Sequence, residues 1–164
     1  MIYAVIDTNV LVSSQLSKNP TAATVKVISK MIDGLITPVY NKEMIAEYKE
    51  VMHRKKFKFK EEDIQVLLGF ITEYGIHTDR IPYEGEMPDE KDRPFYEVSL
   101  SMEDSFLITG NLKYFPKTPK VVTPAELIDI MEQQRKPHPI GVICHSVLVQ
   151  VRQGRAAGRG LSVV

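Results

Sequence analysis

Three acidic side chains stand at positions where an α/β protein can use them for catalysis. Asp7 directly follows the apolar run Ile2–Ile6, which has the length of a buried strand. Glu47 lies about 40° outside the apolar arc of the amphipathic helix predicted for residues 41–53. Asp92 begins a later helix and falls on its buried side. Carboxylates gathered without a rich set of His or Cys favour Mg²⁺ or Mn²⁺, ions that can activate a water to cut a phosphodiester.

Each of these acids also has an ordinary structural explanation. Asp7 is able to cap the segment Thr8–Leu16, and Asp92 to cap the helix that it begins. Glu47 taken alone reads as a solvated glutamate. The hypothesis of a metal site therefore depends on all three acids being placed together.

Two further polar residues flank the strand predicted at Ser105–Thr109. Asp104 precedes this strand, and Asn111 lies just beyond its carboxyl end, on the same edge of the sheet as Asp7. Ligands of open α/β sheets bind beyond the carboxyl ends of the strands, so Asn111 is expected beside Asp7.

The elements that must position these residues alternate between strand and helix, which argues for an α/β domain with a mostly parallel sheet. Asn19 and Pro20 resemble a helix start, and Thr123–Glu126 resembles a capping box. Residues 79–91 contain two prolines and a glycine and are predicted to form a loop. Strands are predicted at residues 2–6, 35–37 (closed by Pro38), 105–109 and 121–122, and helices at 20–33, 41–53, 61–74, 94–102 and 124–134.

Charge divides the chain into two parts. Residues 1–134 hold 16 basic and 21 acidic side chains, a net charge of −5, whereas residues 135–164 hold five basic side chains and no acid. We predict a domain over 1–134 and a basic tail over 135–164, disordered or non-native, that is either a docking segment or a translated frameshift product. With no basic leader, no apolar run of 18 residues and a single cysteine, the sequence favours a cytoplasmic protein without a membrane span or disulfide.

The segment 54–60 concentrates positive charge and aromatic rings. It is able to hold RNA phosphates, with Phe57 or Phe59 available for stacking on a base. Alternatively, it is a solvated helix end whose phenylalanines pack inward. The basic residues of this segment are Arg54, Lys55, Lys56, Lys58 and Lys60.

Four segments, in order, resemble the motifs of the PIN-domain family, most closely the VapC-like toxin components of bacterial toxin–antitoxin systems. They are Val5–Ser13, Ile45–Met52, Asp92–Val98 and Asp104–Asn111, and the resemblance covers residues 1–134.

This resemblance implies a three-layer α/β/α sandwich with a mostly parallel central sheet. It also implies an Mg²⁺- or Mn²⁺-dependent endoribonuclease that acts on RNA, forms a homodimer and is silenced by a cognate antitoxin. Asn111 occupies the position at which many relatives have a fourth acid, and its lack of charge favours one metal ion over two. By resemblance, the metal would be held by Asp7, Glu47 and Asp92, with Asn111 as an additional ligand and with Asn9, Asp104 and Thr109 in support.

Two other functions remain open at this point. Loss of the fourth acid at Asn111 is compatible with a catalytically decayed module that binds nucleic acid or protein. A phosphatase with Asp7 as covalent nucleophile is a weaker alternative, because such enzymes usually carry a second Asp at the position of Asn9.

Overall fold

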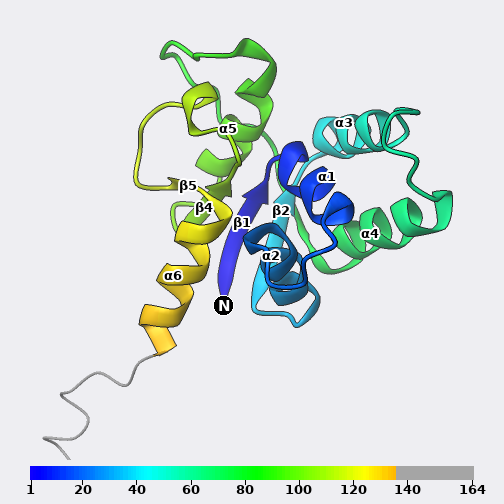
Figure 1. The fold of residues 1–164 in the computed structure, drawn as a ribbon. Helices are drawn as coiled ribbons and strands as arrows, with labels where there is room; N and C mark the ends of the chain where they lie inside the picture. The colour runs from blue at the N-terminus through cyan, green and yellow to red at the C-terminus, as the bar shows by residue number, and fades with distance from the viewer. Residues whose placement is uncertain (136–164) are drawn as a thin grey trace, which may run out of the picture. The chain divides into compact units, whose positions relative to one another are not determined.

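The computed structural model describes residues 1–135. Its centre is a five-stranded sheet in the order β3-β2-β1-β4-β5, with every neighbouring pair parallel and with helices flanking the sheet (Figure 1). This arrangement confirms the predicted α/β class and parallel sheet. The strands are β1 (Ile2–Ile6), β2 (Ile36–Tyr40), β3 (Ile76–His77), β4 (Ser105–Ile108) and β5 (Val121–Val122).

Most helices begin and end close to the predicted residues, and two of them, α3 and α6, begin at the capping side chains that the sequence offered. The Asn41 side chain accepts a hydrogen bond from the Met44 N–H at 2.9 Å, and Thr123 and Glu126 cap one another's backbone N–H groups at 3.2 and 2.7 Å. The helices are α1 (Thr8–Leu16), α2 (Ala23–Ile32), α3 (Lys42–Met52), α4 (Glu61–Tyr74), α5 (Arg93–Leu100) and α6 (Pro124–Arg135), with short 3₁₀ turns η1 (Glu90–Asp92) and η2 (Leu112–Tyr114).

The strand order creates a crevice at the carboxyl ends of β1 and β4. The chain adds β2 and β3 on one side of β1 and β4 and β5 on the other, so the winding direction reverses between β1 and β4. The Asp7 N–H donates to the Ile108 carbonyl at 2.9 Å, which holds the two strand ends together. Open α/β sheets bind their ligands at such a reversal.

Buried apolar side chains hold α3 and α5 against the sheet and against each other. Ala4 and Val5 of β1 are fully buried, and the buried rings of Tyr48 and Phe95 meet with centroids 5.9 Å apart. Burial of rings of this size is a large favourable term in folding. The helices that carry or follow Glu47 and Asp92 are therefore fixed by the core.

Two local predictions were wrong. The helix expected from Pro20 begins only at Ala23, because Asn19 accepts hydrogen bonds from the Thr21 N–H and hydroxyl and forms a turn. The second strand continues through Pro38, which lies outside the part of β2 that pairs with β3, so its missing N–H costs no bond to that strand.

The short strand β3 was not predicted, since two exposed residues carry no periodic pattern. Within residues 1–135, no helix is both long enough and apolar enough to cross a membrane. The tail predicted from residue 135 onward falls, from residue 136, outside the described residues.

Candidate active site

Asp7 sits at the mouth of the crevice and is held there by donors from two strands' ends. It is 5% exposed and is the N-cap of α1, so the capping interpretation is correct. One carboxylate oxygen, Oδ2, accepts from Asn9 Nδ2 and from Thr109 Oγ1, both at 2.6 Å. Capping therefore leaves Asp7 at the crevice while its orientation is fixed by residues after β1 and β4.

Asn9 and Thr109 connect the two loops that follow β1 and β4. The Asn9 side-chain oxygen accepts from the Gly110 N–H at 2.9 Å, and Thr109 Oγ1 accepts from the Asn111 N–H at 3.0 Å. A Cβ at Gly110 would lie 3.1 Å from the Asn9 oxygen, so a larger residue would press on this contact. Two of the three predicted supporting residues, Asn9 and Thr109, thus hold Asp7 in place.

Glu47 reaches the crevice from α3. Its Oε1 accepts from the Thr8 hydroxyl at 2.6 Å, which ties α3 to the first turn of α1. The next residue, Tyr48, is buried and donates its hydroxyl proton to the carbonyl of Ile6, the last residue of β1. The glutamate is therefore held by neighbouring structure and is not a freely solvated side chain.

Asp92 approaches from the opposite side, at the start of α5. It occupies the N-cap position but accepts no capping hydrogen bond, so the capping interpretation fails here. The acid that does cap is Asp89, whose carboxylate accepts from the Lys91 N–H at 3.0 Å at the start of η1. Asp89 lines the same cleft and was missed from the sequence, although its place three residues before Asp92 was a usable signal.

The loop before Asp92 is braced by a buried carboxylate. Glu97 is 5% exposed and accepts from Arg80 Nε at 2.7 Å and from the Tyr83 N–H at 3.0 Å. Arg80 also donates to Glu43 on α3 at 2.8 Å. Burial raises the pKa of Glu97, but the Tyr83 hydrogen bond and the contacts and charges of Arg80 and Arg93 outweigh it, so the pKa is lowered overall.

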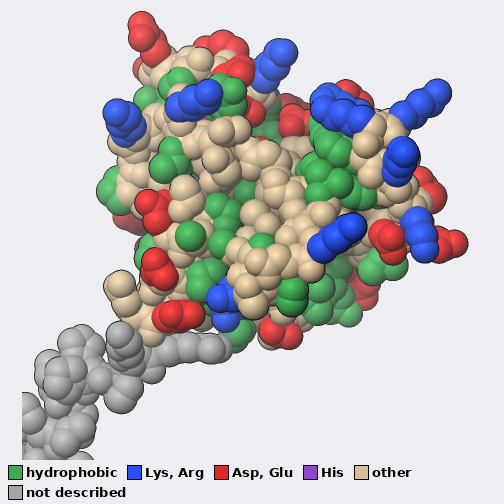
Figure 2. Space-filling view, in the orientation of Figure 1, with side chains coloured by type: hydrophobic (Ala, Val, Ile, Leu, Met, Phe, Trp, Pro, Cys, Tyr) green, Lys and Arg blue, Asp and Glu red, His purple; other side chains and the backbone are tan. Residues whose placement is uncertain are grey.

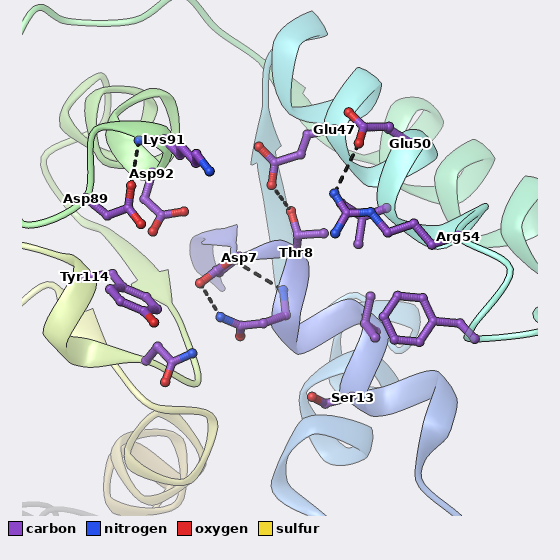
Figure 3. A pocket seen from close by; sticks show the side chains of 15 residues that line it. Asp7, Thr8, Ser13, Glu47, Glu50, Arg54, Asp89, Lys91, Asp92 and Tyr114 are labelled. Atoms are coloured by element: carbon purple, nitrogen blue, oxygen red, sulfur yellow. Dashed lines mark hydrogen bonds and ion pairs between the residues drawn. The ribbon is translucent and has the colours of Figure 1, made fainter.

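These side chains surround one open cleft of about 790 Å³. Figure 3 shows Glu47 and Asp92 directed toward Asp7 from opposite sides. Arg54 and Glu50 lie on the side of Glu47, and Asp89 and Tyr114 lie on the side of Asp92 (Figure 3). The cleft is lined by Asp7, Thr8, Asn9, Val12, Ser13, Glu47, Glu50, Val51, Arg54, Phe57, Asp89, Lys91, Asp92, Asn111 and Tyr114.

Comparison with known families agrees with this geometry. A family model described as PIN domain matches residues 3–113, more than half of the chain. The chain belongs to the PIN-domain family. PIN domains are generally nucleases and typically use divalent metals. Comparisons with curated proteins and with solved structures give no match.

Burial raises the pKa values of Asp7 and Glu47, the two acids of this PIN domain whose carboxylates accept 2.6 Å hydrogen bonds. Burial raises the pKa of Asp7, against the hydrogen bonds from Thr109 and Asn9 that favour its charged form. Burial also raises the pKa of Glu47, opposed by the bond from Thr8 and reinforced by the charge of Asp7. In both cases desolvation outweighs the donors.

Asp92 is the most strongly perturbed acid of the cleft. Burial, followed by the negative charges of Asp7, Asp89 and Glu47, raises its pKa to about 7, while Lys91 acts weakly in the opposite direction. A raised pKa in a cleft is typical of functional carboxylates. The cleft thus gathers more negative charge than its own side chains neutralise.

The donor set suits a hard divalent cation, although the side chains are not yet arranged around one. Within residues 1–135, no group of three or more His, Cys, Asp or Glu side chains is positioned to hold a metal ion. Asp7 and Glu47 direct their oxygens to Asn9, Thr109 and Thr8 instead. Oxygen-only donors and excess negative charge fit Mg²⁺ or Mn²⁺, and hydrogen-bonded carboxylates keep lone pairs for a cation, so binding would require the three acids to draw closer together.

Some predicted site residues do not reach the cleft. Asp104 is exposed and precedes β4, so it lies at the amino end of the strand whose carboxyl end forms the site. Of the basic run, Arg54 lines the cleft, whereas the lysines gather as exposed charges over the α3–α4 connection (Figure 2). Those exposed residues are Lys55, Lys56, Lys58 and Lys60.

Proposed function

We propose that this PIN domain is a metal-dependent endoribonuclease. The observation that carries the proposal is the convergence of Asp7, Glu47 and Asp92, from three separate elements, on one cleft at the sheet's reversal point. Their raised pKa values mark a carboxylate cluster that a cation would stabilise. RNA carries the phosphodiester bonds on which such a cluster can act.

In this proposal Asp7, Glu47 and Asp92 hold Mg²⁺ or Mn²⁺, directly or through water, and the amide oxygen of Asn111 is an additional ligand. A bound cation would lower the pKa of a water, so that the water loses its proton and attacks the phosphorus while the bond to the leaving strand's oxygen breaks. Asn9 and Thr109 orient Asp7 through their 2.6 Å hydrogen bonds. Because Asn111 brings no charge, one metal is favoured over two.

The four motifs that resemble VapC-like toxins extend the proposal to the protein's biological role. We infer a toxin that acts in the cytoplasm as a homodimer and that a cognate antitoxin holds inactive. Sedimentation of the purified chain tests the dimer, and growth arrest on induction, relieved by Asp7→Asn, tests toxicity.

A phosphatase with Asp7 as covalent nucleophile fits this geometry less well. Both oxygens of Asp7 accept hydrogen bonds, and the position two residues later carries the Asn9 amide, which cannot act as a general acid. The decayed binding module remains the main competitor, and it predicts that Asp7→Asn leaves function unaltered.

The experiment that tests the nuclease compares three proteins on a pool of structured RNA with Mg²⁺, Mn²⁺ or EDTA. Wild type should cut only with metal, and Asp7→Asn should not cut. Asp104→Asn is the matched control, because it removes an acid that is exposed and outside the cleft, and it should cut like wild type. Equal cutting by wild type and Asp7→Asn would contradict the proposal, as would absence of both cutting and Mn²⁺ binding by wild type.

A further inference from the structure

Three of the residues that line the carboxylate cleft are apolar. They are Val12, Val51 and Phe57, and we call these three residues the apolar ledge. Val12 lies four residues after Thr8 on α1, and Val51 lies four residues after Glu47 on α3, so each valine is one helical turn, about 5.4 Å, beyond the Thr8–Glu47 hydrogen bond. The ledge therefore adjoins the carboxylates directly.

Phe57 is held in place by the conformation of the loop after α3. Its N–H donates to the Arg54 carbonyl at 3.0 Å, which closes a turn. Lys58 adopts a left-handed backbone with φ of 54°, a conformation that residues other than glycine rarely adopt. The rings of Phe57 and Phe59 are stacked, with centroids 5.5 Å apart and planes at 11°. The loop thus fixes a half-buried ring at the cleft.

Polar groups suited to a nucleotide lie on the same side of the cleft as the ledge. Arg54 lines the cleft and pairs with Glu50 at 3.1 Å in an exposed contact, which is weak enough to exchange for a phosphate. Ser13 follows Val12 on α1 and brings a hydroxyl that can donate to or accept from a base edge. Figure 3 places Arg54 and Ser13 away from Asp92 and Tyr114.

An apolar surface beside a carboxylate cluster does not help to hold a cation. It is suited to the nucleobase, the part of a nucleotide that offers an apolar face. A base is joined to its phosphate through a single sugar. A phosphate held at Asp7, Glu47 and Asp92 therefore places its base at about the distance of the apolar ledge, one helical turn or about 5.4 Å away. We propose that the apolar ledge is a subsite for the nucleobase next to the scissile phosphate, with Phe57 as its main contact. This inference rests on the proposed ribonuclease function.

The subsite requires the base to present an open face. A base inside a duplex is stacked on both faces, so the ledge accepts a base only where the strand is unpaired. Contact with aromatic and apolar side chains tolerates different bases, so the ledge contributes affinity for a base before it contributes sequence preference.

The test separates the base from the phosphate. Binding is measured by fluorescence anisotropy at one fixed salt concentration with Mg²⁺, using the Asp7→Asn protein so that the probe is not cut. One probe is a labelled mixed-sequence heptaribonucleotide, and the other is the sugar–phosphate oligomer of the same length without bases. Phe57→Ala should weaken binding of the first probe about tenfold and of the second less than twofold.

Two further variants keep the result interpretable. Phe57→Leu retains an apolar side chain without a ring. It should weaken binding of the heptaribonucleotide, but by less than the tenfold expected for Phe57→Ala. Phe70→Ala is the matched control, because Phe70 is a half-buried ring on α4 that packs against Tyr74 and does not line the cleft. It should bind both probes like the parent protein.

Equal weakening of both probes by Phe57→Ala, or no weakening of either, would overturn the subsite. Cleavage by wild type together with either result would leave the nuclease standing without the subsite. Base-dependent binding through Phe57, with neither metal-dependent cleavage nor Mn²⁺ binding by wild type, would support a base site on the ledge and contradict the nuclease.

Discussion

Replacing Asp92 with asparagine should stabilise the metal-free protein at pH 8. Burial and the charges of Asp7, Asp89 and Glu47 raise the pKa of Asp92 from its ordinary 3.8 to about 7. Between these two values the folded protein holds a proton that the unfolded chain has released, so stability falls as the pH rises through this window. Above about pH 7 the whole loss is present, and an uncharged asparagine side chain at this position would remove it.

The size of the effect follows from the same pKa. The full difference between 3.8 and about 7 corresponds to about 4 kcal/mol. Asp92 is only half-buried, and solvent screens its neighbours, so we expect roughly 1–2 kcal/mol. For a domain of this size that gain raises the melting temperature by roughly 3–6 °C.

The assay is thermal or urea unfolding of wild type and Asp92→Asn in EDTA from pH 5 to pH 8.5. His53 needs a control, because hydrogen bonds to the Lys49 carbonyl and to Glu61 raise its pKa above 6.5. Its stabilisation is present below pH 6.5 and is lost as the pH rises through the raised pKa, the same direction as for Asp92. His53→Gln removes that part and should leave the Asp92 slope intact.

Addition of Mn²⁺ at pH 8 should stabilise wild type and should stabilise Asp92→Asn less, since the variant lacks one carboxylate for the cation. An equal or lower melting temperature for Asp92→Asn than for wild type at pH 8 in EDTA would refute the electrostatic reasoning. An unchanged slope between pH 5 and pH 8 in the variant would refute it equally.

Three further perturbations test other parts of the structure. Asn111→Asp should lower stability in EDTA at pH 8 and strengthen Mn²⁺ binding in calorimetry by about tenfold or more, because it adds a charge to the cluster; unchanged affinity would remove Asn111 from the site. Gly75→Ala should cost about 1–3 kcal/mol in urea unfolding, because its Cβ would lie 2.3 Å from the Ile71 carbonyl oxygen and 2.8 Å from that of Pro38; a wild-type midpoint would contradict this. Arg80→Met should cost about 1–2 kcal/mol, because the buried Glu97 keeps only part of its compensation, whereas Glu50→Gln, which removes an exposed ion pair, should change stability by less than about 0.5 kcal/mol; equal effects of these two variants would speak against a brace at Glu97.

Much of this protein was readable from the sequence because the relevant signals are local. The apolar spacing of α3 predicted its buried face and put Glu47 at its edge, and the structure places Glu47 in the cleft. Asp7 and Asn111 follow strands of a parallel sheet, whose carboxyl ends share one edge, so their common location was expected before any contact was known. The apolar spacing of a helix, and the position of a residue before or after a strand, can both be read from neighbouring residues in the chain.

Other features depended on which elements approach one another in space. The order of the strands, with the reversal between β1 and β4, decides that the ends after Asp7 and Thr109 meet. The same geometry leaves Asp104 at the amino end of β4, although it stands only seven residues before Asn111 in the chain. The position of Asp104 before the strand already placed it at the opposite end from Asn111, and only the family resemblance made it a candidate for the site.

Tertiary packing also decided the roles of residues whose types were ambiguous. Asp7 both caps α1 and lines the cleft. Asp92 accepts no capping hydrogen bond, since Asp89 caps the preceding turn η1, and its carboxylate is therefore available to a ligand. Phe57 turned out to line the carboxylate cleft only because α1, α3 and the following loop converge there. Sequence determined which residues carry the chemistry and on which elements they lie; the through-space approach of those elements, driven by burial of the shared core, determined which of them act together.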